Sequence, residues 1–248
     1  MNWVFPIAGH GTRTSSLGRY KPFIEIIPNH TILKLCLLGL KSLIKSKDRL
    51  VFITSEEQEI KYSVSKTIKT TLSQLNLKNK IDVVLLDSTP KGQALTVKYA
   101  IEKLDTGFLE SKTFVVNSDQ LVFFDIGNVN LNICSVGLYF NDGNASCFFD
   151  LDIKNRLVSK IREKTKISCY AAAGVFYFNT GKRLLDCINW AINENKFYKN
   201  ELYLGPCMEY FKDLSYFQTS VKFDLGNVEK IKLFNGFIKN LVEMENTE

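Results

Sequence analysis

Hydrophobic positions along the first half of the chain follow two patterns. Short, continuous apolar runs predict four buried strands, at residues 3–8, 50–54, 81–86 and 113–117. Longer stretches between these runs predict helices, at residues 31–44, 56–75 and 93–104. Because strands and helices alternate, this half is predicted to form a parallel sheet with helices on both faces.

The second half of the chain is built from shorter segments. Apolar stretches at residues 132–140, 145–151 and 157–162 are separated by turn-forming residues, which predicts an antiparallel meander added to the sheet. A strand at 171–178 and helices at 182–194 and 202–212 are predicted to follow. The sequence shows no repeat and no linker, so we expect a single α/β domain over residues 1–248, with a Rossmann-like, doubly wound mixed sheet that is mostly parallel.

The composition narrows the class of protein. Hydrophobic residues make up 45% of the chain and charged residues 23%, as in soluble proteins with an ordinary core. No apolar run approaches the ~18 residues that span a membrane, and no basic-then-apolar leader opens the chain. We therefore expect a cytoplasmic protein without a membrane partner. Six scattered cysteines with no Cys-x-x-Cys pair predict free thiols rather than a zinc site.

Charge and histidine content point to small anionic ligands. The net charge is +6, but the lysines are dispersed and no block of five or more basic residues occurs. This pattern favours anionic small molecules over nucleic acid. The chain has only two histidines, His10 and His30, and neither has an obvious partner for a Ser-His-Asp or Cys-His mechanism.

A glycine-containing loop follows the first predicted strand. Gly9 comes directly after Ala8, Gly11 and Arg13 follow at steps of two residues, and Lys21 lies one loop further on. Glycine N–H groups can approach an anion closely, and arginine offers a planar fork of donors suited to phosphate. The loop thus has the parts needed to hold a polyphosphate, although it matches neither the P-loop nor the dinucleotide-binding pattern.

This loop and five later segments resemble, in order, the motifs of the nucleotidyltransferases that activate sugar 1-phosphates, the nucleotide-sugar pyrophosphorylases. The loop is similar to G-x-G-T/S-R followed by P-K-P, with Tyr20 in place of the first proline. Ser118 and Asn227 replace a glycine and a threonine of the family pattern. The later segments are Gly92-Gln93-Ala94, Asn117-Ser118-Asp119, Ile161-Arg162-Glu163-Lys164, Ala173-Gly174-Val175-Phe176-Tyr177 and Phe223-Asp224-Leu225-Gly226-Asn227. The Asn-Ser-Asp-Gln variant resembles a branch associated with surface-polysaccharide synthesis.

The resemblance implies a nucleotide-binding half at about 1–130 and an acceptor-binding half at about 131–248. It implies Mg²⁺ as cofactor and an NTP and a small phosphorylated acceptor as partners. The implied site residues fall into four groups. These are Arg13 and Lys21 for catalysis; Ala8, Gly9, Gly11, Thr12, Asp87, Gly92 and Gln93 for the nucleotide; Glu163, Lys164, Gly174 and Glu201 for the acceptor; and Asp119 and Asp224 for the metal.

The implied reaction fits this residue inventory. A phosphomonoester oxygen attacks the α-phosphorus of an NTP and releases pyrophosphate. The nucleophile is already mostly ionised at neutral pH, since its second pKa is about 6, so it needs no general base. Catalysis then depends on positioning and charge neutralisation by magnesium, arginine and lysine. Mg²⁺ takes oxygen ligands and often only one or two carboxylates plus phosphates.

One acidic residue is a candidate for recognising the nucleotide base. Asp87 lies five residues before Gly92, near the expected position of the base edge. A carboxylate accepts from the amino group of cytosine or guanine, which favours CTP or GTP. A turn aspartate is an equally good interpretation of the same residue.

The other assignments also have plain structural alternatives. Asp119 and Asp224 can be turn or cap residues, Lys164 can be a solvated surface lysine, and Arg162 competes with it for the acceptor phosphate. Glu201 can be a carboxylate at a helix N-terminus.

Two further function classes stay open. A glycosyltransferase would need an Asp-x-Asp, which residues 117–119 do not supply. An inactive nucleotide-sugar-binding protein would be expected to have lost Arg13, Lys21 or an aspartate, and all are present. The sequence is also compatible with a homo-oligomer.

Overall fold

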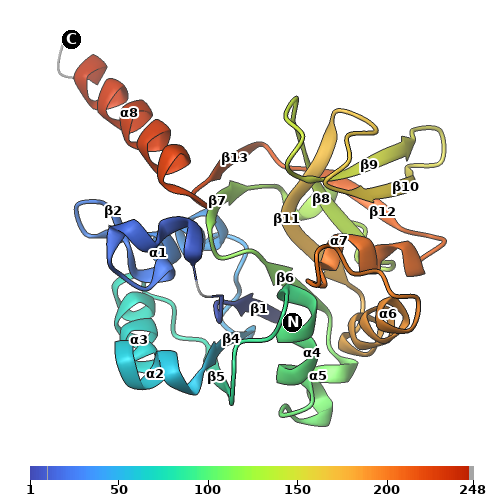
Figure 1. Cartoon of the computed structure of the whole chain (residues 1–248), viewed down its shortest axis with the longest axis horizontal. Coiled ribbons are helices and arrows are strands. Elements are labelled where there is room, and N and C mark those ends of the chain that lie inside the picture. The colour runs from blue at the N-terminus through green and yellow to red at the C-terminus, as the bar shows by residue number, and fades with distance from the viewer. Residues whose placement is uncertain (10, 246–248) are drawn as a thin grey trace.

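A mixed sheet organises the chain in the computed structural model, which describes residues 1–9 and 11–245. Within these residues the main sheet has nine strands in the order β5-β4-β1-β6-β11-β8-β12-β10-β9 (Figure 1). Its first part is parallel, as predicted. It consists of β5 (Lys80–Leu86), β4 (Arg49–Ser55), β1 (Asn2–Pro6) and β6 (Thr113–Val116).

The order of the parallel strands reverses beside β1. The chain adds β4 and then β5 on one side of β1, and it returns to place β6 on the other side. In register, Trp3 lies between Leu50 of β4 and Phe114 of β6. Ligands of open α/β sheets bind where the strand order reverses, outside the carboxyl ends of the strands. The loops after β1 and β6 both lie at this edge.

Helices cover both faces of the parallel part, as the alternation of segments predicts. Side chains of successive strand residues point to opposite faces. Trp3 and Phe5 therefore belong to one buried cluster with residues of α1 (Ile32–Leu40) and α3 (Val64–Gln74), while Val4 belongs to another. The single helix expected at 56–75 is divided into α2 (Glu56–Tyr62) and α3, because Ser63 adopts a left-handed conformation with φ of 50°.

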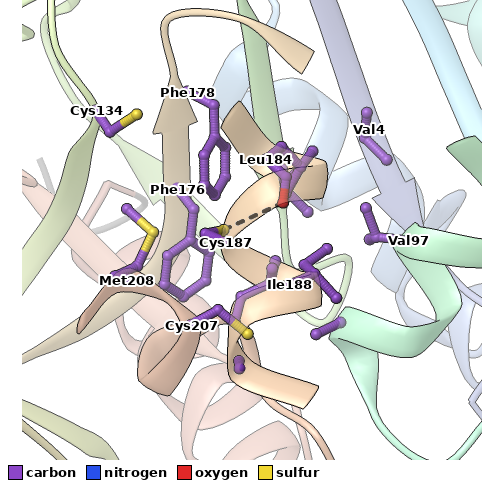
Figure 2. Packing of buried hydrophobic residues seen from close by; sticks show 14 of the residues in the cluster. Val4, Val97, Cys134, Phe176, Phe178, Leu184, Cys187, Ile188, Cys207 and Met208 are labelled. Atoms are coloured by element: carbon purple, nitrogen blue, oxygen red, sulfur yellow. Dashed lines mark hydrogen bonds between the residues drawn. The ribbon is translucent and has the colours of Figure 1, made fainter. Parts of the chain in front are cut away.

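The second face is packed by α4 (Gln93–Ile101) and α6 (Gly181–Asn193), with α5 (Thr106–Glu110) beside them. Figure 2 shows Cys187 and Ile188 of α6 among Phe176, Val97 and Met208. Cys187 is fully buried and donates its thiol to the backbone oxygen of Leu184 at 3.1 Å. All six cysteines are free, and only Cys169 is exposed. The prediction of free thiols is therefore confirmed.

The second half corrects the predicted strand order. The expected segments form β8 (Ser135–Phe140), β9 (Cys147–Asp152), β10 (Leu157–Glu163) and β11 (Tyr170–Phe178), joined by β12 (Ser215–Gln218). β9 and β10 form an antiparallel hairpin, but β8 pairs with β11 and β12 instead of β9, so the simple meander is wrong. Only β8 and β12 are parallel here, so the sheet is mostly parallel in its first half alone. A pairing of β11 with β9 closes these five strands into a ring.

Several short elements were not predicted. β7 (Gln120–Phe123) pairs with β13 (Val221–Asp224), and β2 (Glu25–Ile27) pairs with β3 (His30–Thr31). The expected helix at 202–212 is only α7 (Leu204–Cys207) and a 3₁₀ turn, Met208–Tyr210.

The last element was also not predicted. α8 (Val228–Glu245) extends away from the rest of the molecule (Figure 1). Within residues 1–9 and 11–245, none of the helices has the length and apolarity that crossing a bilayer requires.

Candidate active site

The glycine loop lies against the lysine that follows it. Gly11 has a φ of +62°, a conformation that favours glycine. A side chain at this position would place its Cβ only 2.9 Å from the Cβ of Lys21. Lys21 opens a 3₁₀ helix, Lys21–Phe23, while Thr12 opens another, Thr12–Leu17. The structure thus brings Gly11 and Lys21 together.

A buried hydrogen-bond network holds the backbone of this loop. Gln58 Nε2 donates to the backbone oxygen of Ala8 at 2.9 Å and to that of Gly9 at 3.4 Å. Thr89 Oγ1 also donates to the Ala8 oxygen, at 2.9 Å, and the Tyr20 hydroxyl donates to the backbone oxygen of Ile7. Such contacts restrict the loop's conformation before any ligand binds.

The sequence motifs do not include these supporting residues, although the sequence carries one signal for them. Ser55 and Gln58 form a capping box at the start of α2, a pattern that the sequence S-x-x-Q shows. Gln58 and Tyr20 are both buried, at 6% and 5% exposure. The contact between Gln58 and Ala8 joins residues 50 positions apart, and no local pattern encodes it.

Lys21 is paired with one of the two predicted metal ligands. Its ammonium nitrogen lies 2.6 Å from Asp119 Oδ2. The ammonium group of Lys230, on α8, pairs with Asp224 Oδ2 in the same way. The β7–β13 pairing sets Asp224 opposite Gln120, and Leu225 N donates to the backbone oxygen of Asp119 at 2.8 Å. Segments about a hundred residues apart in the sequence therefore meet at this point.

Gly226 shows how close the two carboxylates lie. A Cβ at this glycine would be 2.7 Å from Asp224 Oδ1 and 3.2 Å from Asp119 Oδ2. Both carboxylates thus border the space that a side chain would fill. Two hard oxygen donors without nitrogen or sulfur partners suit Mg²⁺, which takes its remaining ligands from phosphates and water. In the part of the chain that the structure describes, no third acidic, His or Cys residue completes a larger metal cluster.

Lysine charges keep Asp224 ionised. Burial of this carboxyl group opposes ionisation, but the charge of Lys222 and the hydrogen bond and charge of Lys230 outweigh it, together with the Gly226 N–H. The pKa of Asp224 is therefore below its ordinary value. An ionised carboxylate is the form that binds a metal.

The predicted base loop, Gly92-Gln93-Ala94, is fixed by its contact with residue 202. Gly92 has a φ of +103°, and a Cβ there would lie 2.4 Å from the backbone nitrogen and oxygen of Leu202. Leu202 N donates to the Lys91 oxygen at 3.1 Å, and Ala94 N donates to the Leu202 oxygen at 3.0 Å. Only glycine fits at this close approach of two backbones.

Gln93 connects the base loop to the end of β6. Its Nε2 donates to Asn117 Oδ1 at 2.5 Å, and Asn117 N donates to the Gly174 oxygen at 2.8 Å. Gly174 has a φ of +72°, and a Cβ there would contact Gln120 and Asn117 at 2.7 and 2.9 Å. Gln93, predicted for the nucleotide, and Gly174, predicted for the acceptor, therefore both lie against Asn117.

The remaining predicted acceptor residues form a group of their own. Lys164 lies 3.4 Å from Glu163 and 5.7 Å from the ring centre of Tyr203, and it donates to the backbone oxygen of Ala145. The Tyr203 hydroxyl donates to Glu201. Because Leu202 lies between Glu201 and Tyr203 and contacts Gly92, this acceptor group adjoins the base loop.

One predicted residue, Asp87, is not joined to the others by the contacts that the structure describes. The Asp87 side chain is 86% exposed and pairs with Lys103 at 2.9 Å, a contact that lowers the pKa of Asp87. The Asp87 carboxylate thus binds Lys103, which takes no part in the contacts described for the base loop. The side chain of Arg13 lies outside the described residues. Its backbone belongs to the 3₁₀ helix that begins one residue earlier, at Thr12.

The fold matches solved structures, whereas no protein-family model and no curated protein matches the chain. A nucleoside-diphosphate-sugar pyrophosphorylase from Vibrio cholerae RC9 is 18% identical, with a TM-score of 0.81, over 94% of this chain and 99% of that one. The inositol-1-phosphate CTP transferase from T. maritima is 14% identical, with a TM-score of 0.67, over 92% of this chain and 90% of that one. A CTP:phosphocholine cytidylyltransferase from Streptococcus pneumoniae is 12% identical, with a TM-score of 0.68, over 96% of this chain and 98% of that one. The chain therefore has the α/β fold of these nucleotidyltransferases over nearly its whole length.

Proposed function

We propose that this protein is a Mg²⁺-dependent nucleotidyltransferase that joins an NTP to a sugar 1-phosphate or another small phosphomonoester and releases pyrophosphate. The observation that carries the proposal is the cluster of Lys21, Asp119, Asp224 and Gly226 beside the glycine loop. The proposal is supported by the fold, which this chain shares with solved nucleotidyltransferases, and by the position of Lys21 and Asp119 in the loops that follow β1 and β6.

Each part of the site has a task in this reaction. The N–H groups of the glycine loop, Arg13 and Lys21 bind the triphosphate and stabilise the charge that develops as pyrophosphate leaves. Lys164 holds the acceptor phosphate, positioned by Glu163 and Tyr203. Asp119 and Asp224 would hold Mg²⁺, which when bound supplies charge neutralisation at the phosphates. The ionised acceptor needs no base, in agreement with a site assembled without histidine.

The nucleotide and the acceptor are left open in this proposal. Similar folds act on CTP with inositol 1-phosphate in one case and on CTP with phosphocholine in another, according to the names of those proteins. The preference for CTP or GTP depended on Asp87, and the pairing of Asp87 with Lys103 gives that preference no support. A cytoplasmic location, a role in surface-polysaccharide synthesis and a homo-oligomer stay predictions from the sequence.

The test is a screen of the four NTPs and dTTP against a panel of phosphomonoesters, with coupled detection of pyrophosphate. We expect release with at least one pair, dependent on Mg²⁺ and lost in Asp119→Asn. Asp125→Asn is the matched control, since Asp125 caps a turn by accepting from Gly127 N at 2.8 Å and contacts none of the site residues described above. NTP binding without pyrophosphate release for any pair would contradict the proposal, and consumption of nucleotide sugars with release of a nucleoside diphosphate would replace it with a glycosyltransferase.

A further inference from the structure

A groove of about 290 Å³ lies beside Asp224 and is lined by residues of β8, β13 and α8. Its charged lining residues are Lys222, Asp224 and Lys230, and the others are aromatic or aliphatic. Glu229, the acidic residue in the first turn of α8, is exposed and does not line the groove. Two positive charges and one negative charge therefore face this space from the described residues.

Lys222 stands beside Asp224 on one face of β13. Side chains alternate along a strand, so residues two positions apart share a face. Phe223, between them, points the other way and packs against the rings of Phe234 and Phe237, with ring centres 5.2 and 5.1 Å away. The ammonium group of Lys222 is thus placed next to a carboxylate that we propose as a metal ligand.

The Lys222 ammonium group has no acidic partner of its own. Its nitrogen lies 3.8 Å from the ring centre of Tyr139. The Asp224 carboxylate pairs with Lys230 instead, and among the described residues no carboxylate forms an ion pair with Lys222. A contact with an aromatic ring holds an ammonium group more weakly than a charge-assisted hydrogen bond to an anion does. Lys222 is therefore available to a negatively charged ligand.

Tyr139 connects the groove to the group around Lys164. The Tyr139 hydroxyl accepts from Asn141 Nδ2 at 2.8 Å and lies 3.3 Å from Ser146 Oγ. The backbone oxygen of Ser146 in turn accepts from Lys164 N at 2.9 Å. One tyrosine side chain thus contacts Lys222 with its ring and the neighbour of Lys164 with its hydroxyl. This places Lys222 on the acceptor side of Asp224.

We propose that Lys222 binds a second negative group of the acceptor, so that the protein prefers phosphomonoesters that also carry a carboxylate or another phosphate. The inference rests on the proposed function, in which Lys164 holds the phosphate that reacts. With Asp224 engaged by Lys230 or by the proposed metal, a neutral acceptor would leave the Lys222 ammonium group without a negative partner. Lysine is a point charge with rotatable donors, so either kind of anion satisfies it.

Matched acceptors in the pyrophosphate assay test this preference. Glucose 1-phosphate is compared with glucuronic acid 1-phosphate, which differs by a carboxylate, and with glucose 1,6-bisphosphate, which differs by a phosphate. Glycerol 3-phosphate and 3-phosphoglycerate form a third pair on a smaller backbone. The measured quantity is the ratio of kcat/KM values within each pair, with the NTP that is active in the screen. The carboxylate and phosphate pairs show separately which anion Lys222 favours.

We expect the member with the second negative group to be preferred about tenfold or more, the usual effect of one charge-assisted hydrogen bond. Lys222→Met keeps the length of the side chain and removes its charge, so the ratio should fall close to one. Lys222→Arg should retain most of the preference. Lys232→Met is the matched control, because Lys232 is an exposed lysine of α8 outside the groove, and the full preference should persist.

Two results would overturn the inference. The first is an equal kcat/KM for both members of every pair in the wild-type protein. The second is an unchanged preference in Lys222→Met; if kcat/KM then falls by the same factor for both members, Lys222 acts on the nucleotide or the metal. Both results leave the proposed function standing. Absence of pyrophosphate release with every acceptor would instead remove the proposed function and this inference with it.

Discussion

Replacing Lys21 by methionine should move metal binding and catalysis in opposite directions. The Lys21 ammonium group lies 2.6 Å from Asp119 Oδ2, and the two side chains are only 15% and 28% exposed. A divalent ion bound to this carboxylate would meet the lysine charge at close range. Two unit charges about 4 Å apart interact by about 1 kcal/mol in water, so a divalent ion is repelled by about 2 kcal/mol, or about 30-fold in affinity. Retreat of the flexible lysine reduces this, which leaves an expected gain of about five- to thirtyfold for Lys21→Met.

The assay is calorimetric titration with Mg²⁺ in the absence of nucleotide, alongside initial rates of pyrophosphate release. We expect tighter Mg²⁺ binding and a turnover lower by about 10²–10³, the usual cost of one lost donor at a developing charge. Lys34→Met is the matched control, because Lys34 contacts Gln74 and the Asn29 backbone away from the site. It should change neither quantity. Thermal stability should fall little, since a partly exposed ion pair contributes at most about 1 kcal/mol.

Two outcomes would contradict this role of Lys21. If Lys21→Met weakened Mg²⁺ binding as much as Asp119→Asn does, the lysine would support the metal site instead of competing with it. If both Mg²⁺ affinity and turnover stayed at wild-type values, the pairing of Lys21 with Asp119 would have no functional role.

Three further predictions concern single positions of the site. Gly226→Ala should lower Mg²⁺ affinity and turnover with the fold intact, because its Cβ would stand 2.7 Å from Asp224 Oδ1 and 3.2 Å from Asp119 Oδ2; unchanged calorimetry would contradict this. Asp87→Ala should leave the ranking of NTPs by kcat/KM unchanged, and a changed ranking would return Asp87 to the base site. Burial opposes ionisation of Asp224, but Lys222 and Lys230 outweigh it and lower its pKa from the ordinary 3.8. The ionised carboxylate therefore stabilises the fold above pH 3.8. This stabilisation is lost as the pH falls through the lowered pKa. Urea unfolding without metal should therefore show Asp224→Asn less stable than wild type at pH 7, with the difference shrinking at pH 3.

The parallel half of the fold is encoded locally and could be predicted. Val4 and its neighbours form an uninterrupted apolar run because both faces of β1 are covered, and such a run is distinctive. The break at Ser63 was not predictable from spacing, because the apolar positions of α2 and α3 are compatible with one helix. The order of the later strands depends on pairings between distant segments, such as Tyr216 of β12 with Val136 of β8. A strand of four residues carries too little pattern to specify its neighbour.

The candidate site also has features that the sequence predicts and features that it does not. Loop motifs predict Gly11, Lys21 and Asp119 as site residues, because glycines and charged residues next to a strand end can be recognised in the sequence. The motifs did not predict which of these side chains are in contact with one another. The pairing of Lys21 with Asp119 spans 98 residues. Gln58 was missed for the same reason, because its capping of α2 is visible in the sequence while its contact with Ala8 is not.

The charges around Asp119 and Asp224 indicate how the ligands of the proposed metal site would depend on one another. Asp119 and Asp224 face three ammonium groups, those of Lys21, Lys222 and Lys230. A divalent cation alone adds positive charge to a cluster in which lysines already neutralise both carboxylates. A polyphosphate brings the opposite charge and offers the lysines new partners, which frees the carboxylates for the metal. Under the proposed function, Mg²⁺ and the nucleotide should therefore each raise the affinity of the other by the same factor, as linkage requires. The lysines that weaken metal binding in the free protein would then be the groups that couple the metal to the nucleotide.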